Sequence, residues 1–424
     1  MKRTLALLLV ILLSISLFAC DKYPDPSVTT VSDSGEKFMI GLICPDDSDQ
    51  AENDSCLHAN HLVKAMRRNG MDTDGKMYIE NSIPTEKSAV REAIDRSVES
   101  GADMIFGIDA GYADAMVEAA KVYPNVIFCQ YGRGDGNGAN YIRYYVPVHR
   151  VYTILGAAAG QRSTELNCDS IGFISLYGLE DSEATAAINA FAVAARIFNP
   201  EATVYLKVTK SGSEGEAARA LIQEQGCKVL AQYGGGETVL TTASELGAVA
   251  CGSWFYSSGQ NVSGHLISPE YSWYKFYVDA IEKACKCDSA ANFAKKMRTD
   301  SFIGTVGIDD DSVLTVTAPG PGAGAYTKCI LPYMQGTNSV FLYNEETEDP
   351  DDGKTVRLGI NMDVFCGWRF WLTQFDEVYT ATKFEPADLK DRDGNVIVAA
   401  GGTCMTLDEI LAMDYYLEGV EPVE

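Results

Sequence analysis

The sequence predicts an α/β protein with two successive lobes, each built on a parallel sheet. Short apolar runs alternate with amphipathic stretches from residue 38 onward, and the alternation starts again after about residue 146. Apolar runs of about four to eight residues are typical of buried strands, and longer amphipathic stretches are typical of helices. Strands that alternate with helices in this way form β-α-β units over a parallel sheet. The 424 residues are enough for two medium-sized cores.

The first lobe is expected to hold three strand–helix pairs and then two further strands. Each apolar run is short enough for a strand, and each amphipathic stretch suits a helix. The expected elements, in chain order, are 38–44, 57–69, 77–80, 86–100, 104–108, 113–122, 126–130 and 141–146.

The second lobe repeats the alternation and then loses it. A short strand over 264–268 and a helix over 269–286, opened by Pro269, are expected to follow. The run 319–324, rich in proline and glycine, predicts a break or a crossing between lobes, and acidic 345–352 predicts a solvated loop. The expected elements of this lobe are 171–176, 185–198, 204–208, 214–225, 229–232, 238–246 and 249–252.

Ligands bind to open parallel sheets beyond the carboxyl ends of the strands. The loops of interest are therefore those that leave a predicted strand. They follow Cys44, Ile108, Gln130, Leu176, Gln232 and Gly252.

The first twenty residues have the features of a bacterial lipoprotein export signal. Lys2 and Arg3 precede an apolar run over 5–13, and small Ala19 stands before Cys20. This run is too short to span a bilayer as a permanent helix. We expect Cys20 to become the lipid-carrying N-terminus, tethered to the extracytoplasmic face of the cell membrane. A cleaved secretory signal with an incidental cysteine is the alternative.

These features predict a division of the whole chain into a signal peptide with its lipobox, a flexible polar tether and two lobes. Each lobe is assembled from two stretches of the chain, and the second carries an extra segment at about 300–375. The predicted ranges are 1–20 for the signal, 21–37 for the tether, 38–146 plus 258–298 for the first lobe, and 147–257 plus 299–424 for the second.

The net charge of −25 argues against a nucleic-acid partner, because such surfaces demand clustered lysine and arginine. Of the twelve cysteines, eleven remain without Cys20, which is an odd number. Either some of them form disulfides or all stay reduced, and we favour the second explanation. Several, such as Cys44 and Cys129, lie in apolar runs and suit small buried side chains.

The motifs expected of an enzyme are missing from the sequence. No Gly-x-Ser-x-Gly follows a predicted strand, and only four histidines are present as bases. The glycine-rich run 132–138 lacks the helix that a dinucleotide site needs and suits a flexible connection. We therefore expect neither enzymatic activity nor a cofactor. An extracellular hydrolase acting on a small nucleoside-like molecule is the alternative.

A metal site is a second alternative. Cys56, His58 and His61 lie close together behind a run of acidic residues, and histidines three positions apart share a helix face. No fourth ligand stands at a defined spacing. A solvated helix start is the simpler interpretation.

Aromatic residues and glycines at predicted strand ends favour a binding site. Tyr112 lies at the tip of one loop, Tyr233 leads into three glycines, and Trp254 and Phe255 follow the last strand of the second lobe. Stacking on a planar heterocycle contributes about 1–3 kcal/mol per ring. Such rings beside exposed backbone suit a small flat ligand.

The order of segments resembles the basic membrane protein family of solute-binding lipoproteins, which includes the purine nucleoside receptor type. The resemblance spans about residues 38–290 and the C-terminal tail. It lies in Gly101-Ala-Asp-Met-Ile-Phe106, Gly111-Tyr-Ala-Asp114, Tyr123-Pro-Asn-Val126, Gly156-Ala-Ala-Ala-Gly160, Ile188-Asn-Ala-Phe191, Asn199-Pro200, His265-Leu-Ile-Ser-Pro269 and the stretch from Asp393-Gly394 to Met413-Asp414.

This resemblance implies a type I periplasmic-binding-protein fold, with two Rossmann-like lobes joined by a hinge that the chain crosses three times. It also implies that a ligand is held between the lobes and delivered to an ABC importer. Ser253 or Trp254 stands where the family carries an acidic residue that grips ribose. The neighbouring Trp254 and Phe255 favour a base or another flat molecule over a nucleoside.

We therefore predict a lipid-anchored, monomeric solute-binding protein whose partners are a purine-like molecule and an ABC transporter permease. A planar solute would be oriented by side chains and glycine backbone and would stack on aromatic rings. The predicted ligand-binding residues are Asp46, Asp47, Asp109, Gly111, Tyr112, Asn189, Gly234, Gly235, Trp254, Phe255 and Trp273.

Overall fold

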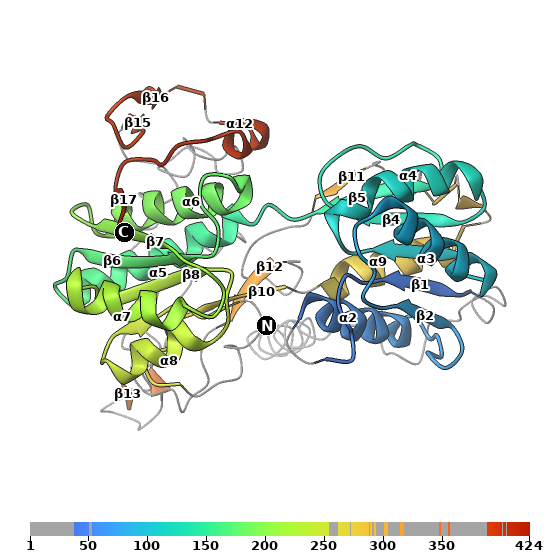
Figure 1. Cartoon of the computed structure of the whole chain (residues 1–424), viewed down its shortest axis with the longest axis horizontal. Helices are drawn as coiled ribbons and strands as arrows, with labels where there is room; N and C mark the ends of the chain where they lie inside the picture. The colour runs from blue at the N-terminus through green and yellow to red at the C-terminus, as the bar shows by residue number, and fades with distance from the viewer. Residues whose placement is uncertain are drawn as a thin grey trace, which may run out of the picture.

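The structure is a computed structural model in which two α/β lobes lie side by side (Figure 1). It describes residues 38–50, 53–253, 262–271, 273–287, 289–290, 292–293, 301–303, 314–317, 347–348, 355–356, 388–400, 402–403 and 405–424. Most of the predicted extra segment at 300–375, the export signal with Cys20, and the tether lie outside these residues.

The first lobe contains a six-stranded sheet in the order β11-β5-β4-β3-β1-β2, with all neighbours parallel. Side chains alternate between its two faces, so Leu42 and Phe106 enter one core and Ile43 and Ile105 the other. Its strands are β1 (Ile40–Ile43), β2 (Met77–Glu80), β3 (Met104–Gly107), β4 (Ile127–Tyr131), β5 (Tyr141–Tyr145) and β11 (Ser301–Ile303).

Helices cover both faces of this sheet. Helices α2 (Asp54–Arg68) and α9 (Trp273–Cys285) pack against one face, although more than 200 residues separate them. Helices α3 (Lys87–Glu99) and α4 (Ala113–Val122) pack against the other, after a short turn η1 (Ala110–Tyr112).

The second lobe contains a five-stranded parallel sheet in the order β17-β7-β6-β8-β9. Its strands are β6 (Ser170–Ser175), β7 (Thr203–Val208), β8 (Val229–Tyr233), β9 (Val249–Ala250) and β17 (Val420–Pro422). Helices α7 and α8 cover one face and α5 and α6 the other. These helices are α5 (His149–Glu165), α6 (Ser182–Phe198), α7 (Glu214–Glu224) and α8 (Thr238–Glu245).

Two glycines let α5 and α6 pack closely. A Cβ atom on Gly156 would lie 2.2 Å from the carbonyl oxygen of Phe191, and one on Gly160 would lie 2.2 Å from that of Ala195. Such distances are far below van der Waals contact, so only glycine allows this approach. The predicted run Gly156-Ala-Ala-Ala-Gly160 therefore serves helix packing.

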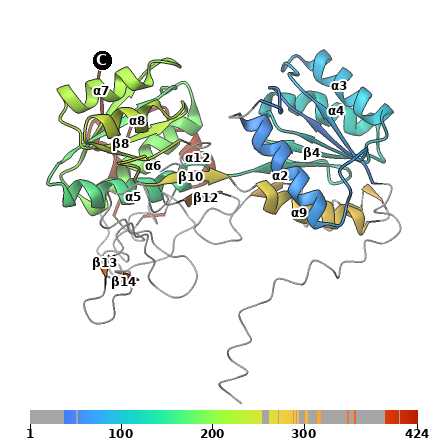
Figure 2. The ribbon, with the colours of Figure 1, turned by 90° about the horizontal axis from the view of Figure 1, so that it is seen from below.

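Within the described residues, the chain passes from one lobe toward the other at three places, as the resemblance implied. It leaves β5 for α5, it returns through β10 (Ser268–Tyr271) to α9, and it leaves β11 for β12 (Leu314–Thr317). Strands β10 and β12 pair antiparallel, and Figure 2 shows them between the two lobes. The predicted two-lobed α/β fold of the type I periplasmic-binding-protein class is confirmed.

Three details differ from the expectations. Strand β11 joins the first lobe's sheet, beyond the predicted boundary at 298, because it pairs with the edge strand β5. His265 bridges to Ala250 beside β9, so this stretch lies with the second lobe although the first was expected to resume at 258. The predicted helix at 269–286 is wrong at its start, since Pro269 lies in β10 and the helix begins at Trp273.

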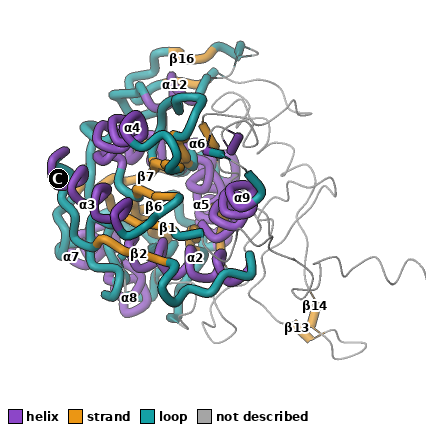
Figure 3. The backbone as a smooth tube through the Cα atoms, turned by 90° about the vertical axis from the view of Figure 1, so that its right-hand side faces the viewer, coloured by secondary structure: helices purple, strands orange, loops and turns teal. Residues whose placement is uncertain are grey.

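A C-terminal arm, defined as residues 388–424, packs on the second lobe. It contains β15 (Leu389–Lys390), β16 (Val396–Val398), α12 (Leu407–Leu411) and β17. Figure 3 shows β16 and α12 at one end of the molecule, above α6. Within the described residues, no helix has both the length and the hydropathy to cross a membrane.

Candidate functional site

Tyrosines stand at the ends of strands from both lobes. Tyr131 ends β4 in the first lobe, Tyr233 ends β8 in the second, and Tyr271 ends the connecting strand β10. All three are partly buried. Tyr177 follows β6, and its ring meets that of Tyr233 edge-on at 6.1 Å between centroids. The carboxyl edges of the two sheets thus present a set of aromatic faces.

Glu183 brings a carboxylate from the second lobe to these rings. It lies in the first turn of α6, which Asp181 caps by accepting a hydrogen bond of 2.8 Å from the backbone N–H of Ala184. Glu183 is close enough to interact electrostatically with Tyr131, Tyr233 and Tyr271. Residues of both lobes therefore lie within electrostatic range of one carboxylate.

The surroundings of Glu183 disfavour its charged form. Burial raises the pKa of Glu183 to about 7, although the neighbouring Tyr145 hydroxyl and the guanidinium of Arg133 act in the opposite direction. Near neutral pH, this carboxyl can therefore both donate and accept hydrogen bonds.

The first lobe contributes a second acidic group. Asp54, the first residue of α2, interacts electrostatically with Tyr131 and Tyr271, as Glu183 does. Asp46 and Asp109, in the loops after β1 and β3, are close enough to interact with Asp54. The predicted residues Asp46 and Asp109 thus share one sheet edge with the tyrosine site, whereas Asp47 accepts hydrogen bonds from its own loop, from Asp49 and Gln50.

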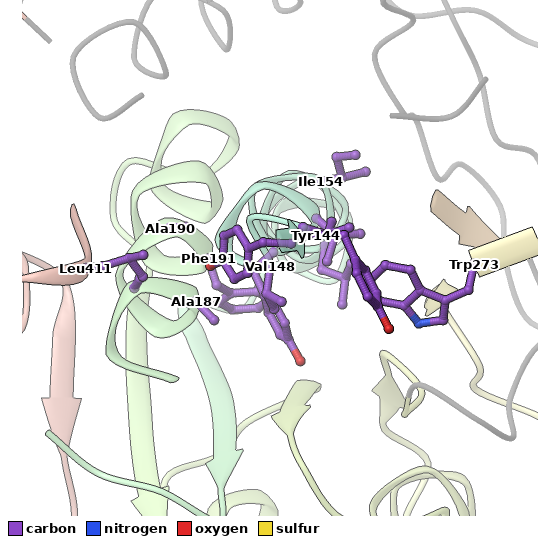
Figure 4. Packing of buried hydrophobic residues seen from close by; sticks show 14 of the residues in the cluster. Tyr144, Val148, Ile154, Ala187, Ala190, Phe191, Trp273 and Leu411 are labelled. Atoms are coloured by element: carbon purple, nitrogen blue, oxygen red, sulfur yellow. The ribbon is translucent and has the colours of Figure 1, made fainter. Parts of the chain in front are cut away.

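Trp273 lies behind Tyr271 at the start of α9. Its ring is nearly parallel to the rings of Tyr271 and His58, at centroid distances of 5.1 and 5.0 Å. Tyr131 and Tyr144 meet it edge-on, and Figure 4 shows Tyr144 and Trp273 together in the packed interior. Trp273 is only 2% exposed, so it supports Tyr131 and Tyr271 from behind.

Several predicted site residues have partners inside the protein. Tyr112 is fully buried, and its hydroxyl donates a hydrogen bond of 2.5 Å to the carbonyl of Ile83. Asp109 accepts a bond of 2.7 Å from the backbone N–H of Gly111 and so caps the turn before α4. Asn189 is buried and bonds the backbone of the C-terminal arm at Tyr415 and Leu417. We leave Tyr112 and Asn189 out of the site proposed below.

Gly234 and Gly235 follow Tyr233 with φ angles of +75° and +76°. Residues other than glycine rarely adopt this backbone conformation. Because glycine has no side chain, the backbone beside Tyr233 is not covered by a Cβ atom. A Cβ on Gly235 would lie 2.9 Å from Oε1 of the buried Glu214.

The metal alternative finds no support among the described residues. The Nδ1 atom of His58 lies 2.5 Å from the Tyr277 hydroxyl, and its ring stacks on Trp273. The Cys56 sulfur accepts a hydrogen bond from Asn60. His61 lies on the same helix, yet the described residues hold no group of three His, Cys, Asp or Glu side chains that could bind a metal.

The structure does not test the predicted role of Trp254 and Phe255, and it bears on the state of some cysteines. Trp254 and Phe255 lie outside the described residues. Six described cysteines are free thiols, namely Cys44, Cys56, Cys129, Cys168, Cys227 and Cys285.

Tyr131, Tyr271 and Glu183 were not among the predicted site residues, and Asp54 belonged only to the acidic run of the metal alternative. Tyr131 follows directly on a predicted strand, so the rule that selected Tyr112 could have found it. Glu183 lies in the first turn of a helix, where acidic residues commonly stabilise the helix through its dipole. The sequence around it therefore gives no signal that it belongs to a site.

Two parallel α/β lobes with three connections, and polar and aromatic residues on facing strand ends, define a periplasmic-binding-protein-like solute receptor. The chain belongs to the family of PnrA-like ABC transporter substrate-binding proteins, whose model matches residues 53–312. The predicted family is therefore confirmed. Proteins of this family bind substrates for transport and are not enzymes.

Curated relatives cover part of the chain. A putative ABC transporter glucose-binding protein of Haloferax volcanii is 32% identical over 212 residues, 48% of this chain and 51% of that protein. A purine-binding protein of Brucella abortus is 27% identical over 179 residues, 41% of this chain and 49% of that protein. The chain thus aligns with about half the length of each.

A solved structure supports the fold. An ABC transporter solute-binding protein from Conexibacter woesei superposes with a TM-score of 0.50 at 16% identity, over 67% of this chain and 90% of that one.

Proposed function

We propose that the protein captures a planar, purine-like solute between its lobes and delivers it to an ABC transporter permease. The observation that carries this proposal is that Tyr131 of the first lobe lies within electrostatic range of Glu183 and Tyr233 of the second. Tyrosine faces stack on flat heterocycles, and a carboxyl group bonds the N–H and ring-nitrogen atoms at their edges.

Delivery follows from the arrangement of the site on two lobes. A solute that contacts both lobes binds best when they are close together, so occupancy favours the closed form. A permease that recognises the closed form then receives loaded protein.

The protein would be exported and anchored by a lipid, as the sequence predicts. Cys20 would carry the lipid, residues 21–37 would tether the lobes, and the protein would act as a monomer on the extracytoplasmic face of the membrane. Mass spectrometry of the membrane-extracted protein tests this part, because a diacylated Cys20 has a distinct mass.

A thermal-shift panel on residues 21–424 tests the solute class. Purine bases, nucleosides, flavins, sugars and amino acids are added separately, because a saturating ligand stabilises the folded state by mass action. We expect a shift with purines or another flat heterocycle. A shift confined to sugars would contradict the stacking site and would agree with the name of the Haloferax relative.

A further inference from the structure

One charged contact of the structure joins the first lobe to the C-terminal arm. Arg133 follows β4 in the first lobe, and its guanidinium forms an ion pair with Asp408 of α12. The two residues are 275 positions apart in sequence. The arm lies beyond residues 53–312, which match the family model, so the contact involves a part of the chain outside that match.

The arm is held to the second lobe. Strand β17 pairs with β7, and buried Asn189 of α6 bonds the arm backbone on both sides of Tyr416. The apolar side of α12 completes the attachment, since Figure 4 shows Leu411 against α6 near Ala187 and Ala190. Asp408 is therefore carried by the second lobe.

The Arg133 loop is held to the first lobe. The Arg143 guanidinium, almost fully buried, donates hydrogen bonds to the carbonyls of Gly132 and Arg133. Gly132 has a φ of +105°, a conformation that favours glycine, and its N–H bonds the carbonyl of Tyr144 at 2.9 Å. The backbone is thus fixed, and the Arg133 side chain extends toward the second lobe.

Arg133 also reaches the proposed solute site. Its charge acts on Glu183 and on Tyr145, the last residue of β5 before the chain enters the second lobe. A group that holds Arg133 therefore fixes a positive charge within electrostatic range of Glu183. Asp408 is such a group.

We propose that Asp408 of the C-terminal arm positions Arg133 across the lobe interface, so that the pair stabilises this arrangement of the two lobes. Arg133 is thus a positioning residue, and the arm is a further connection between the lobes. Exposed ion pairs are individually weak, so we expect effects of about two- to fivefold.

The test measures the distance between the lobes without any solute. Fluorophores on unnatural residues at exposed Val122 of α4 and Thr241 of α8 report this distance by energy transfer, which avoids labelling the native thiols. We expect Asp408→Asn to shift the distribution toward longer distances and Asp408→Glu to preserve it. Raising the salt concentration should shift the unsubstituted protein toward the Asp408→Asn distribution.

Glu418→Gln is the matched control. Glu418 pairs with Arg196 of α6 at 3.2 Å, so this variant removes an ion pair of the arm that does not reach the first lobe. We expect its distance distribution to match that of the unsubstituted protein. The proposal is overturned if Asp408→Asn leaves the distribution unchanged, or if Glu418→Gln shifts it equally.

A second readout depends on the proposed function. For a solute found by the thermal-shift panel, Asp408→Asn should weaken affinity about two- to fivefold at low salt. Because the distance measurement needs no solute, failure of the proposed solute class leaves it intact, whereas an unchanged distance distribution contradicts the positioning role itself.

Discussion

The side chain of Asn189 accepts a hydrogen bond of 2.8 Å from the backbone N–H of Leu417, 228 residues further along the chain. Its amide group also donates a bond of 3.0 Å to the carbonyl of Tyr415. One buried side chain on α6 thereby replaces a strand partner for an irregular part of the C-terminal arm, and it holds the arm to the second lobe.

Asn189→Leu should loosen the arm. It leaves the N–H of Leu417 and the carbonyl of Tyr415 without partners, at a cost of about 1–3 kcal/mol for each buried group. Urea unfolding should show a lower free energy, and limited proteolysis should cut the arm faster. Asn395→Ala removes one side-chain hydrogen bond, to Asp391, on an exposed turn of the same arm and is the control. Equal cleavage rates for the two variants would contradict this role.

Glu183 should make stability depend on pH. Burial raises the pKa of Glu183 from 4.5 to about 7, so between these values the folded protein keeps a proton that the unfolded chain has lost. The free energy of unfolding should therefore fall as pH rises through this window. In Glu183→Gln the fall should be smaller, as urea titrations at pH 5 and pH 7.5 would show. Parallel curves for both proteins would count against the raised pKa of this carboxyl.

His58 should make the protein less stable as pH falls, the opposite of the effect of Glu183. Burial lowers the pKa of His58 from 6.5 to about 3. Below pH 6.5, this histidine therefore binds a proton in the unfolded chain but stays neutral in the folded protein. At pH 5 this uptake should cost the folded state about 2 kcal/mol relative to pH 7.5. His58→Gln keeps a polar partner for Tyr277 and should show a smaller acid loss in urea unfolding. An equal loss would mean that the histidine is not held neutral.

Gly156→Ala tests the close packing of α5 and α6. The added methyl group would lie 2.2 Å from the carbonyl oxygen of Phe191, so the helices must separate. Overpacking of this kind costs about 1–3 kcal/mol. Gly236→Ala is the control, because nothing lies within 4 Å of its added Cβ. Thermal unfolding should distinguish the two variants, and similar melting temperatures would contradict the packing argument.

Local patterns were sufficient to predict most of the fold. The strands β1 to β8 lie where apolar runs predicted them, and the helices between them, apart from α5, lie where amphipathic stretches predicted them. Helix α5 was not predicted, because most of its residues are buried and it has no clear polar face. Strand β11, with three residues, is too short to give a pattern. The start of α9 was predicted too early, at Pro269, because proline suits both a first helical turn and an irregular strand.

The candidate site was less predictable than the fold. Strand-end positions indicated Asp46, Asp109 and the glycines after Tyr233, since these follow from the order of elements along the chain. The proximity of Glu183 to Tyr131 follows from how the two lobes face each other, which no local pattern encodes. Tyr112 and Asn189 belong to segments that match the family, yet their burial is set by tertiary packing.

Titration calorimetry on Tyr131→Ala tests the central claim most directly. The solute with the largest thermal shift is titrated into the unsubstituted protein, into Tyr131→Ala and into Tyr123→Ala, which removes a ring on the far side of the first lobe that contacts Arg91 and Asp95. Loss of a stacked ring costs about 1–3 kcal/mol, or about 5- to 150-fold in affinity. We predict this loss for Tyr131→Ala and none for Tyr123→Ala, whereas unchanged affinity in Tyr131→Ala would contradict a solute site between the lobes.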